Sequence, residues 1–370
     1  MKVTGLSWTS FRLPLRAPFQ TAGGAMTHRE GLVLRLATDA GLVGLGEASP
    51  HPAAGPRAAR EIDEALARLA PRLLGAEVGC LDELASEAPP ALACALDTAS
   101  CDAMAKGGGV SVAQLLGGRA RSSVLVNATI AAADETEAAS QAKAARKAAG
   151  KAAFACVKLK VGMAASVQEE RRRVAAVRRA LGSSVRLRVD ANGAWDVEQA
   201  IDTIQALEEY DLELVEQPVR PGDLEGMARV RRAVGTPIAA DEDVTGLDAA
   251  RRVLEAGAAE LLVVKLMVVG GLRPARQIAE LASAAGVAVV VTTTIDAGVG
   301  TAAALHLAAT LPEDGPACGL ATGSLFVDDL VVRPLAARDG RMELPAGPGL
   351  GVELDEEKLA QYGGVEKVVA

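Results

Sequence analysis

The chain has 370 residues and a net charge of −8, with half of its residues hydrophobic and only 2% aromatic. This length accommodates one large domain or two, and the core must be built mainly from Ala, Val and Leu. The acidic balance argues against a nucleic-acid or anionic-membrane surface, and no basic cluster with interleaved aromatic residues occurs in the sequence.

We expect neither a signal peptide nor a membrane span, and no metal site made of cysteines or histidines. The first residues lack the apolar segment of a signal peptide, and no apolar run is long enough for a membrane span. Five scattered cysteines without a C-x-x-C pair are typical of reduced thiols, so we expect a cytoplasmic protein. The three histidines form no metal-ligand spacing, and His306 is expected to be a packing residue.

The first 106 residues predict a small α+β unit. Segments 2–13, 31–38 and 42–48 have strand character, and Asp39-Ala40-Gly41 is a good hairpin turn. Helices are expected at 58–73 and about 90–106. Two segments rich in small residues and prolines, 17–28 and 49–57, are expected to be loops, the first of them not rigid.

From residue 122 onward short apolar runs alternate with helical segments. Alternation of this kind predicts parallel βαβ units, and about eight strands in roughly 200 residues favour a barrel over an open sheet. No G-x-G-x-x-G follows a first strand, which weakens a dinucleotide-binding alternative. After residue 330 the alternation stops, and we expect the tail to fold back on the N-terminal sheet. The predicted strands are 124–130, 155–160, 185–190, 212–216, 237–241, 261–265, 287–293 and 317–320.

Charged residues end one predicted strand after another. They are Lys158, Lys160, Asp190, Glu216, Asp241 and Lys265. In a parallel barrel the carboxyl ends of the strands meet at one mouth, where active sites lie. A charge at the end of a buried run is costly without a partner. Two alternatives remain open: the lysines could be solvated on an edge strand, and Asp190 or Asp241 could cap the following helix.

The residue types at these strand ends predict a particular chemistry. Three converging carboxylates repel one another unless a cation lies between them, and hard oxygen ligands suit Mg²⁺ or Mn²⁺. A lysine close to a second lysine and a divalent cation has a lowered pKa, so it can act as a base near neutral pH.

These motifs together resemble the enolase superfamily, in its muconate-lactonizing-enzyme branch. The motifs are Lys158-x-Lys160, Asp190-Ala191-Asn192, Glu216-Gln217-Pro218, Asp241-Glu242 and Lys265. The resemblance implies an α/β fold in which a modified (β/α)₇β TIM barrel, 122–330, is covered by an α+β capping domain, 1–121. The C-terminal segment 331–370 would complete the cap. Barrels of this type commonly form homo-oligomers.

The resemblance also implies roles for the residues. Asp190, Glu216 and Asp241 would bind Mg²⁺ or Mn²⁺, and the metal would hold the enediolate charge that develops on a small carboxylate substrate. Lys160 would take the α-proton, and Lys158 would tune it. Lys265 would act from the opposite face. The family usually has Ser or Thr at the place of Asp243. Asp241 is preferred to Glu242 and Asp243 as third ligand because its interval to Glu216 fits.

Expected substrate contacts come from the barrel and from both cap loops. They are Asn192, Thr292, Thr293, Thr294, Phe19, Met26 and His51. The three threonines, with the backbone N–H groups of the next helix, resemble the segment that o-succinylbenzoate synthases use for a second carboxylate. The Asp-x-Asp of dipeptide epimerases is missing from Gly319–Gly323. The first hypothesis is therefore o-succinylbenzoate synthase, a dehydration in menaquinone or phylloquinone synthesis. Alternatives are an N-succinylamino acid racemase, a dipeptide epimerase, a muconate-type cycloisomerase and a non-catalytic Mg²⁺-binding barrel.

Overall fold

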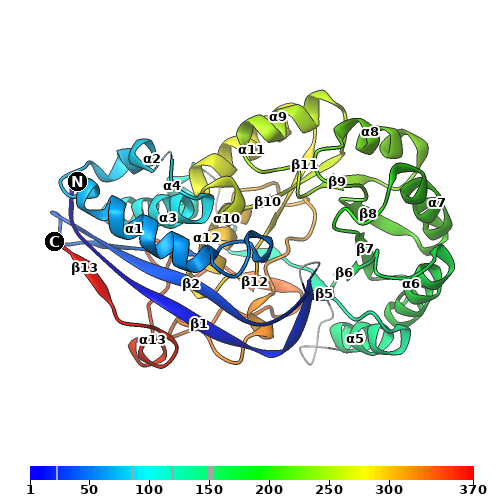
Figure 1. Cartoon of the computed structure of the whole chain (residues 1–370), viewed down its shortest axis with the longest axis horizontal. Coiled ribbons are helices and arrows are strands. Elements are labelled where there is room, and N and C mark those ends of the chain that lie inside the picture. Colours follow the sequence, from blue (N-terminus) through cyan, green and yellow to red (C-terminus); the bar gives the residue numbers. More distant parts are fainter. Residues whose placement is uncertain (22–23, 86, 118–120, 148–153) are drawn as a thin grey trace.

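The structure is a computed structural model that describes residues 1–21, 24–85, 87–117, 121–147 and 154–370. An N-terminal α+β part, the cap, lies beside a curled parallel sheet with helices on its outside (Figure 1). The expected α/β architecture, a barrel with an N-terminal cap, is confirmed. No helix within the described ranges is both long and apolar enough to cross a membrane.

The cap is built on a four-stranded sheet of order β13-β1-β2-β3. The expected turn at Asp39–Gly41 joins β2 to β3, with Gly41 at φ 71°. The strands are β1 (Val3–Thr21), β2 (Gly24–Thr38), β3 (Val43–Ala48) and β13 (Lys367–Val369). Figure 1 shows the red strand β13 along the blue strand β1, and the two pair antiparallel.

The prediction of a loop at 17–28 is wrong. β1 and β2 continue as one long hairpin through this segment, and Phe19 pairs with Met26 across it. A shift of register between Pro14 and Phe19 accommodates the prolines of β1. The prolines and glycines favoured a loop in the sequence, but backbone pairing between the two arms of the hairpin overrides that signal. Residues 22–23 lie outside the described part.

Helices cover one side of the cap sheet. The main contact is α3 on β3, where a Cβ on Gly44 or Gly46 would lie 2.0 Å from a carbonyl oxygen of α3, so only glycine permits this approach. The cap helices are α1 (Ala58–Leu73), α2 (Leu81–Leu84), α3 (Pro90–Gly107) and α4 (Val112–Leu115).

Seven parallel strands form the barrel sheet, in the order β11-β10-β9-β8-β7-β6-β5. They are β5 (Ala128–Ile130), β6 (Cys156–Lys160), β7 (Arg186–Asp190), β8 (Leu212–Glu216), β9 (Ile238–Ala240), β10 (Leu261–Lys265) and β11 (Ala288–Thr292). The barrel helices are α5 (Glu135–Lys147), α6 (Val167–Leu181), α7 (Val197–Leu207), α8 (Leu224–Ala233), α9 (Leu247–Glu255), α10 (Leu266–Val269), α11 (Leu272–Ala284) and α12 (Gly298–Ala308).

The predicted strand at 317–320 is present only as isolated bridges. Cys318 bridges to Val126 and Gly319 to Thr292, both in parallel. Backbone hydrogen bonds therefore connect this segment to both edges of the seven-stranded sheet and close the ring.

The predicted strand at 124–130 is divided in two. Its first part, β4 (Ser123–Leu125), pairs antiparallel with β12 (Arg341–Glu343) of the tail, and only its second part, β5, enters the barrel. The tail also contains α13 (Glu356–Tyr362), which precedes β13.

Candidate active site

Three of the predicted site residues lie side by side on one level of the sheet. The register pairs Lys160 on β6 with Asp190 on β7, and Asp190 with Glu216 on β8. Each residue ends an apolar strand, so its side chain projects at the carboxyl end of the sheet, the end where barrel enzymes bind substrate. Asp241 directly follows β9, and Lys265 ends β10. With Lys158, which contacts Asp190 and Glu216, the six charges predicted to converge therefore meet at one mouth.

The lysines and carboxylates of the mouth are joined by short ion pairs. Lys158 Nζ lies 2.9 Å from Asp190 Oδ2 and 2.7 Å from Glu216 Oε1. Lys160 Nζ lies 2.6 Å from Asp190 Oδ2, and Lys265 Nζ lies 2.5 Å from Asp241 Oδ2. The side chain of Lys158 is only 10% exposed and that of Lys265 only 13%. Solvated edge-strand lysines are therefore excluded.

Burial and neighbouring charges shift the pKa values of the acids. Burial, together with the charge of Asp190, raises the pKa of Glu216 to about 8. Burial alone would also raise the pKa of Asp190, but the ammonium groups of Lys158 and Lys160 hold it far below its usual range. Burial outweighs the charge of Lys265 and raises the pKa of Asp241.

The lowered lysine pKa expected beside a divalent cation stays a prediction, because the pKa values of Lys158 and Lys265 reflect only the surrounding protein groups. Burial would lower the pKa of both groups, but the contacting carboxylates outweigh it and raise the pKa of each. The physical reason is that the acids contact the ammonium groups directly.

Asn192 connects Lys160 to an acid in the segment after β9. Its Oδ1 accepts a 2.8 Å hydrogen bond from Lys160 Nζ, and its Nδ2 donates to Glu242 Oε1 at 2.9 Å. The backbone at Asn192 is left-handed, with φ 46°, a conformation that Asn tolerates better than most residues. This contact with Lys160 gives Asn192 a direct role in orienting the lysine, beyond the substrate contact expected from the sequence.

Asp243 has a structural role in the loop after β9. Its Oδ2 accepts from Gln217 Nε2 at 2.8 Å and its Oδ1 from the backbone N–H of Gly222 at 2.6 Å. Gln217 Oε1 in turn accepts from the backbone N–H of Asp241 at 3.0 Å. Sequence reasoning assigned no role to Gln217, which is fully buried and fixes the backbone of the candidate ligand.

The carboxylates at the mouth fit a hard divalent cation. Asp190, Glu216 and Asp241 are buried oxygen donors, and Glu242 Oε2 is buried without a hydrogen-bond partner. Ionised together, these acids need a positive charge, and their donor set is the one Mg²⁺ prefers. Among the described residues no group of three or more acids, His or Cys is arranged to hold a metal ion. The lysine ammonium groups lie against the acids instead.

The threonines after β11 are partly engaged with the protein. Thr293 Oγ1 lies 2.8 Å from Thr322 Oγ1, and Thr294 Oγ1 donates to Asp296 Oδ1 at 2.6 Å. Thr292 Oγ1 is buried without a partner. Thr292 lies beside Lys265, since the register pairs these two residues.

The expectation that backbone N–H groups of α12 are free for a second substrate carboxylate is wrong for three of them. Glu47 of β3 accepts from Ala297 N and Gly300 N, at 2.8 and 2.7 Å. Asp329 accepts from Gly298 N at 2.8 Å. The protein's own acids thus satisfy the positive end of this helix, and Glu47 attaches the cap to the barrel there.

Cap residues differ in how they relate to the mouth. His51 lies close to the charged residues of the mouth. Burial and the charges of Lys265, Arg29 and Lys160 lower the pKa of His51 to about 4, so the imidazole is neutral near pH 7. Phe19 and Met26 form their cross-strand pair in the hairpin, with partly buried side chains against the hydrophobic core. No contact described for either residue reaches the mouth.

Sequence reasoning missed a buried charged cluster where the cap meets the barrel. It consists of Arg29, Glu47 and Asp296, each at most 4% exposed. The available signal was a charged residue within an otherwise apolar strand, as in Gly44-Leu45-Gly46-Glu47-Ala48, but the partners are distant in sequence.

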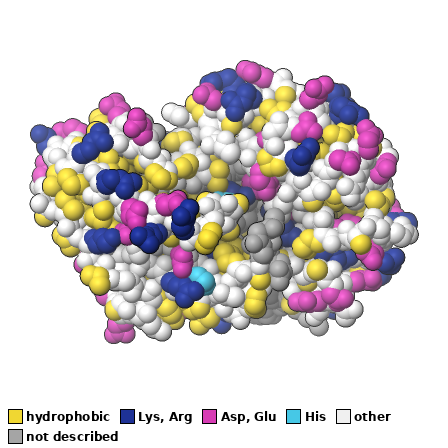
Figure 2. Space-filling model, in the orientation of Figure 1, with side chains coloured by type: hydrophobic (Ala, Val, Ile, Leu, Met, Phe, Trp, Pro, Cys, Tyr) yellow, Lys and Arg dark blue, Asp and Glu magenta, His cyan; other side chains and the backbone are white. Residues whose placement is uncertain are grey.

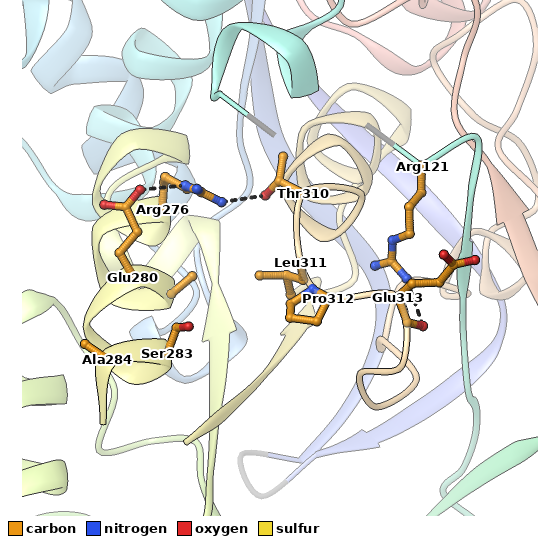
Figure 3. A pocket seen from close by; sticks show the side chains of 10 residues that line it. Arg121, Arg276, Glu280, Ser283, Ala284, Thr310, Leu311, Pro312 and Glu313 are labelled. Carbon is orange, nitrogen blue, oxygen red and sulfur yellow. Dashed lines mark hydrogen bonds and ion pairs between the residues drawn. The ribbon is translucent and has the colours of Figure 1, made fainter. Parts of the chain in front are cut away.

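A cavity of about 690 Å³ lies away from the mouth, between the C-terminal half of α11 and the segment after α12 (Figure 3). Arg276 on its wall binds Glu280 and Thr310, while Arg121 donates to the carbonyl oxygens of Ala308 and Glu313. Both guanidinium groups thus have protein partners. Helix C-termini lie at the end of the barrel opposite the carboxyl ends of the strands, so this cavity is not part of the candidate active site.

The fold and the mouth together define a capped-barrel protein of the enzyme type that positions lysines and carboxylates at strand ends. Two family models match the chain: "Mandelate racemase / muconate lactonizing enzyme, N-terminal domain" over residues 4–117 and "Enolase C-terminal domain-like" over residues 137–358. The chain belongs to the enolase superfamily, in its muconate-lactonizing-enzyme subgroup.

Similar proteins within this family carry out different reactions. A chloromuconate cycloisomerase of Delftia acidovorans is 32% identical over 98% of this chain and 99% of its own length. An o-succinylbenzoate synthase of Thermobifida fusca is 35% identical over 95% of this chain and 90% of its own length. The solved structure of a dipeptide epimerase from Enterococcus faecalis, complexed with Mg and the dipeptide L-Leu-L-Tyr, is 28% identical. It superposes with a TM-score of 0.88 over 95% of this chain and all of that one.

Proposed function

We propose that this protein removes the α-proton of a small carboxylate substrate with Lys160, and that the reaction is the dehydration that forms o-succinylbenzoate. The observation that carries the proton transfer is the position of Lys160. It ends β6 beside Asp190 and is oriented by Asn192. Lys265 ends β10, four strands away in barrel order, so the two ammonium groups approach a substrate in the mouth from different sides.

Asp190, Glu216 and Asp241 would hold one Mg²⁺, or Mn²⁺ in its place. When bound, the ion would neutralise the charge that develops on the substrate carboxylate as the proton leaves. Occupation of these carboxylates would also take from Lys160 its contact with Asp190 and from Lys265 its contact with Asp241. The lysines would then be free to exchange protons with substrate.

In the proposed reaction Lys160 takes the proton from the carbon next to the carboxylate of a hydroxycyclohexadiene carboxylate. The electron pair of the broken C–H bond forms the new ring double bond, and the C–O bond of the neighbouring hydroxyl breaks. In a syn elimination the hydroxyl leaves on the same face, so the protonated Lys160 can return the proton and water departs. Lys265, on the other face, supplies positive charge to the intermediate.

The substrate assignment draws on two further observations. The o-succinylbenzoate synthase relative is 35% identical across nearly the whole chain. The mouth also lacks an obvious anchor for a substrate ammonium group after the last barrel strand. Asp328 pairs there with Lys358, and Asp329 caps α12. Both observations favour an anionic substrate over a dipeptide.

A muconate-type cycloisomerase is the second candidate, because a chloromuconate cycloisomerase matches 98% of this chain. Both candidates use an anionic carboxylate substrate. Figure 2 shows acidic and basic side chains interspersed over one face, without a single-sign patch. A small-molecule substrate is therefore proposed for either reaction. We also propose a cytoplasmic location and association into homo-oligomers.

The experiment is an assay with Mg²⁺ on the o-succinylbenzoate precursor, on cis,cis-muconate, and on N-succinyl amino acids and dipeptides in D₂O followed by ¹H NMR. Rapid dehydration without α-proton exchange in the panel supports the synthase, and lactone formation from muconate supports the cycloisomerase. Exchange at the α-carbon alone would mean a racemase or epimerase. Absence of any turnover or exchange would overturn the proposed chemistry and favour a non-catalytic Mg²⁺-binding barrel.

A further inference from the structure

Ile295, in the segment after β11, has a backbone conformation that its side chain disfavours. Its φ is 66°, in the left-handed region, and a β-branched residue there is a rare outlier. Such a conformation persists only where surrounding contacts impose it, and residues of this kind gather at functional sites. Ile295 directly follows Thr292–Thr294, and the first of these threonines pairs with Lys265 of the mouth.

A side chain of the cap contacts the backbone of Ile295. Arg29 of β2 donates from Nε to the carbonyl oxygen of Ile295 and from Nη2 to that of Pro50, both at 3.0 Å. Arg29 is only 4% exposed, so its guanidinium is committed to these two acceptors in a water-poor setting. One side chain thus fixes the residue after Thr294 and the residue before His51.

The neighbouring acids make the arrangement around Arg29 more rigid. Asp296 Oδ1 accepts from the N–H and hydroxyl of Thr294, at 3.1 and 2.6 Å. Thr294 Oγ1 also lies 3.2 Å from the carbonyl oxygen of Ser49. Asp296 and Glu47 both lie near enough to Arg29 to offset its buried charge. The two loops at the mouth, 49–51 and 293–296, are therefore joined through one buried polar network.

We propose that Arg29 is a positioning residue that holds Ile295 in the left-handed conformation and thereby sets His51 and the threonines against the distal part of the substrate. Arg29 does not contact the reacting atoms in this proposal. The substrate part of the inference rests on the proposed function, but the link between Arg29 and Ile295 does not.

The first test compares melting temperatures of matched substitutions at position 295. Ile295→Gly and Ile295→Ala both remove the side chain, but only Gly relieves the penalty of a positive φ. If Arg29 imposes that φ, the Ile295→Gly protein should melt at a higher temperature than the Ile295→Ala protein when Arg29 is present. This difference in melting temperature should fall by roughly 1–2 °C in an Arg29→Met background. An equal Gly–Ala difference in both backgrounds overturns the proposal. Arg29→Lys, which keeps the charge but can reach only one carbonyl, provides the same comparison if Arg29→Met does not fold.

The second test separates binding from chemistry with whichever substrate the panel identifies. Arg29→Lys should raise KM about tenfold and change kcat less than about threefold, because the reacting groups are untouched. Adding Ile295→Gly to the Arg29→Lys protein should lower the raised KM by at least about threefold, and adding Ile295→Ala should not. A merely structural role would lower the amount of active enzyme without this selective recovery.

The outcomes distinguish the two proposals. If the wild-type protein turns over no substrate of the panel, the proposed function fails, and the melting comparison still decides whether Arg29 holds Ile295. If turnover is normal in the Arg29 variants and the Gly–Ala difference is unchanged, the positioning role fails while the proposed function stands.

Discussion

Lys265 Nζ and Asp241 Oδ2 lie 2.5 Å apart at the ends of neighbouring barrel strands. The pair joins Lys265, which is proposed to supply positive charge to the intermediate, to Asp241, the proposed third metal ligand. If Asp241 binds a cation, it would release Lys265. While Lys265 is bound to Asp241, that carboxylate would not be available as a metal ligand. In the proposed function, metal binding would therefore be coupled to the release of Lys265 through this contact, and to the release of Lys160 through its matching contact with Asp190.

The first prediction concerns the proposed base. Lys160→Ala should lower kcat/KM by about a thousandfold or more, since it removes the only proton acceptor proposed for that face. Mg²⁺ binding, measured by isothermal titration calorimetry, should remain, because the three carboxylates are intact. Lys2→Ala, an exposed lysine far along the chain from the mouth, is the matched control and should leave kcat/KM unchanged. Substantial turnover by Lys160→Ala would rule out the mechanism.

The second prediction identifies the third metal ligand. Asp241→Asn should weaken Mg²⁺ binding by at least about tenfold, because a neutral amide replaces a ligand carboxylate. Asp243→Asn should change Mg²⁺ affinity much less, since Asp243 is already engaged by Gln217 and Gly222. The dissociation constants of the two variants, measured side by side, give the answer. A larger loss for Asp243→Asn would transfer the ligand role to that residue.

The third prediction concerns metal removal and pH. Mg²⁺ at about a hundred times its dissociation constant should stabilise the metal-free protein by about 2.7 kcal/mol, because only the folded chain assembles the site. Since the pKa of Glu216 is raised to about 8 without metal, protons compete with Mg²⁺ for it. The stabilisation should therefore grow between pH 6.5 and 8.5, as measured by melting with EDTA or with Mg²⁺ at each pH. A metal effect independent of pH would contradict the role of Glu216.

The convergence of charged residues at the strand ends was predictable because its signal is local. Each charge directly follows an apolar residue at the end of a predicted strand. The carboxyl ends of parallel strands lie at the same end of the sheet, as with Lys160, Asp190 and Glu216. The barrel class followed from the alternation of strands and helices. The substitutions of Lys160 and Asp241 test the roles proposed for these residues.

The parts that escaped prediction have different causes. The extension of β1 and β2 through 17–28 results from local pairing within one hairpin, which proline and glycine content conceals. The segment 317–320 was predicted as a barrel strand, but it forms only isolated bridges to the two edges of the sheet. The contacts of Arg29 and Glu47 cross from the cap to residues about 250 or more positions later, and no local pattern reveals them.

The last prediction concerns Glu47, which attaches β3 to the start of α12. Burial, and then the charge of Asp296, raises the pKa of Glu47 to about 7. A carboxyl group with a raised pKa binds more protons in the folded than in the unfolded state. The free energy of unfolding should therefore decrease as the pH rises from about 4.5 to about 7, by on the order of 1–3 kcal/mol from this group. Glu47→Gln should flatten this slope, as measured by urea unfolding in EDTA at several pH values. Glu255→Gln, an exposed acid, should retain it. An unchanged slope in Glu47→Gln would show that the buried carboxyl is not the group responsible.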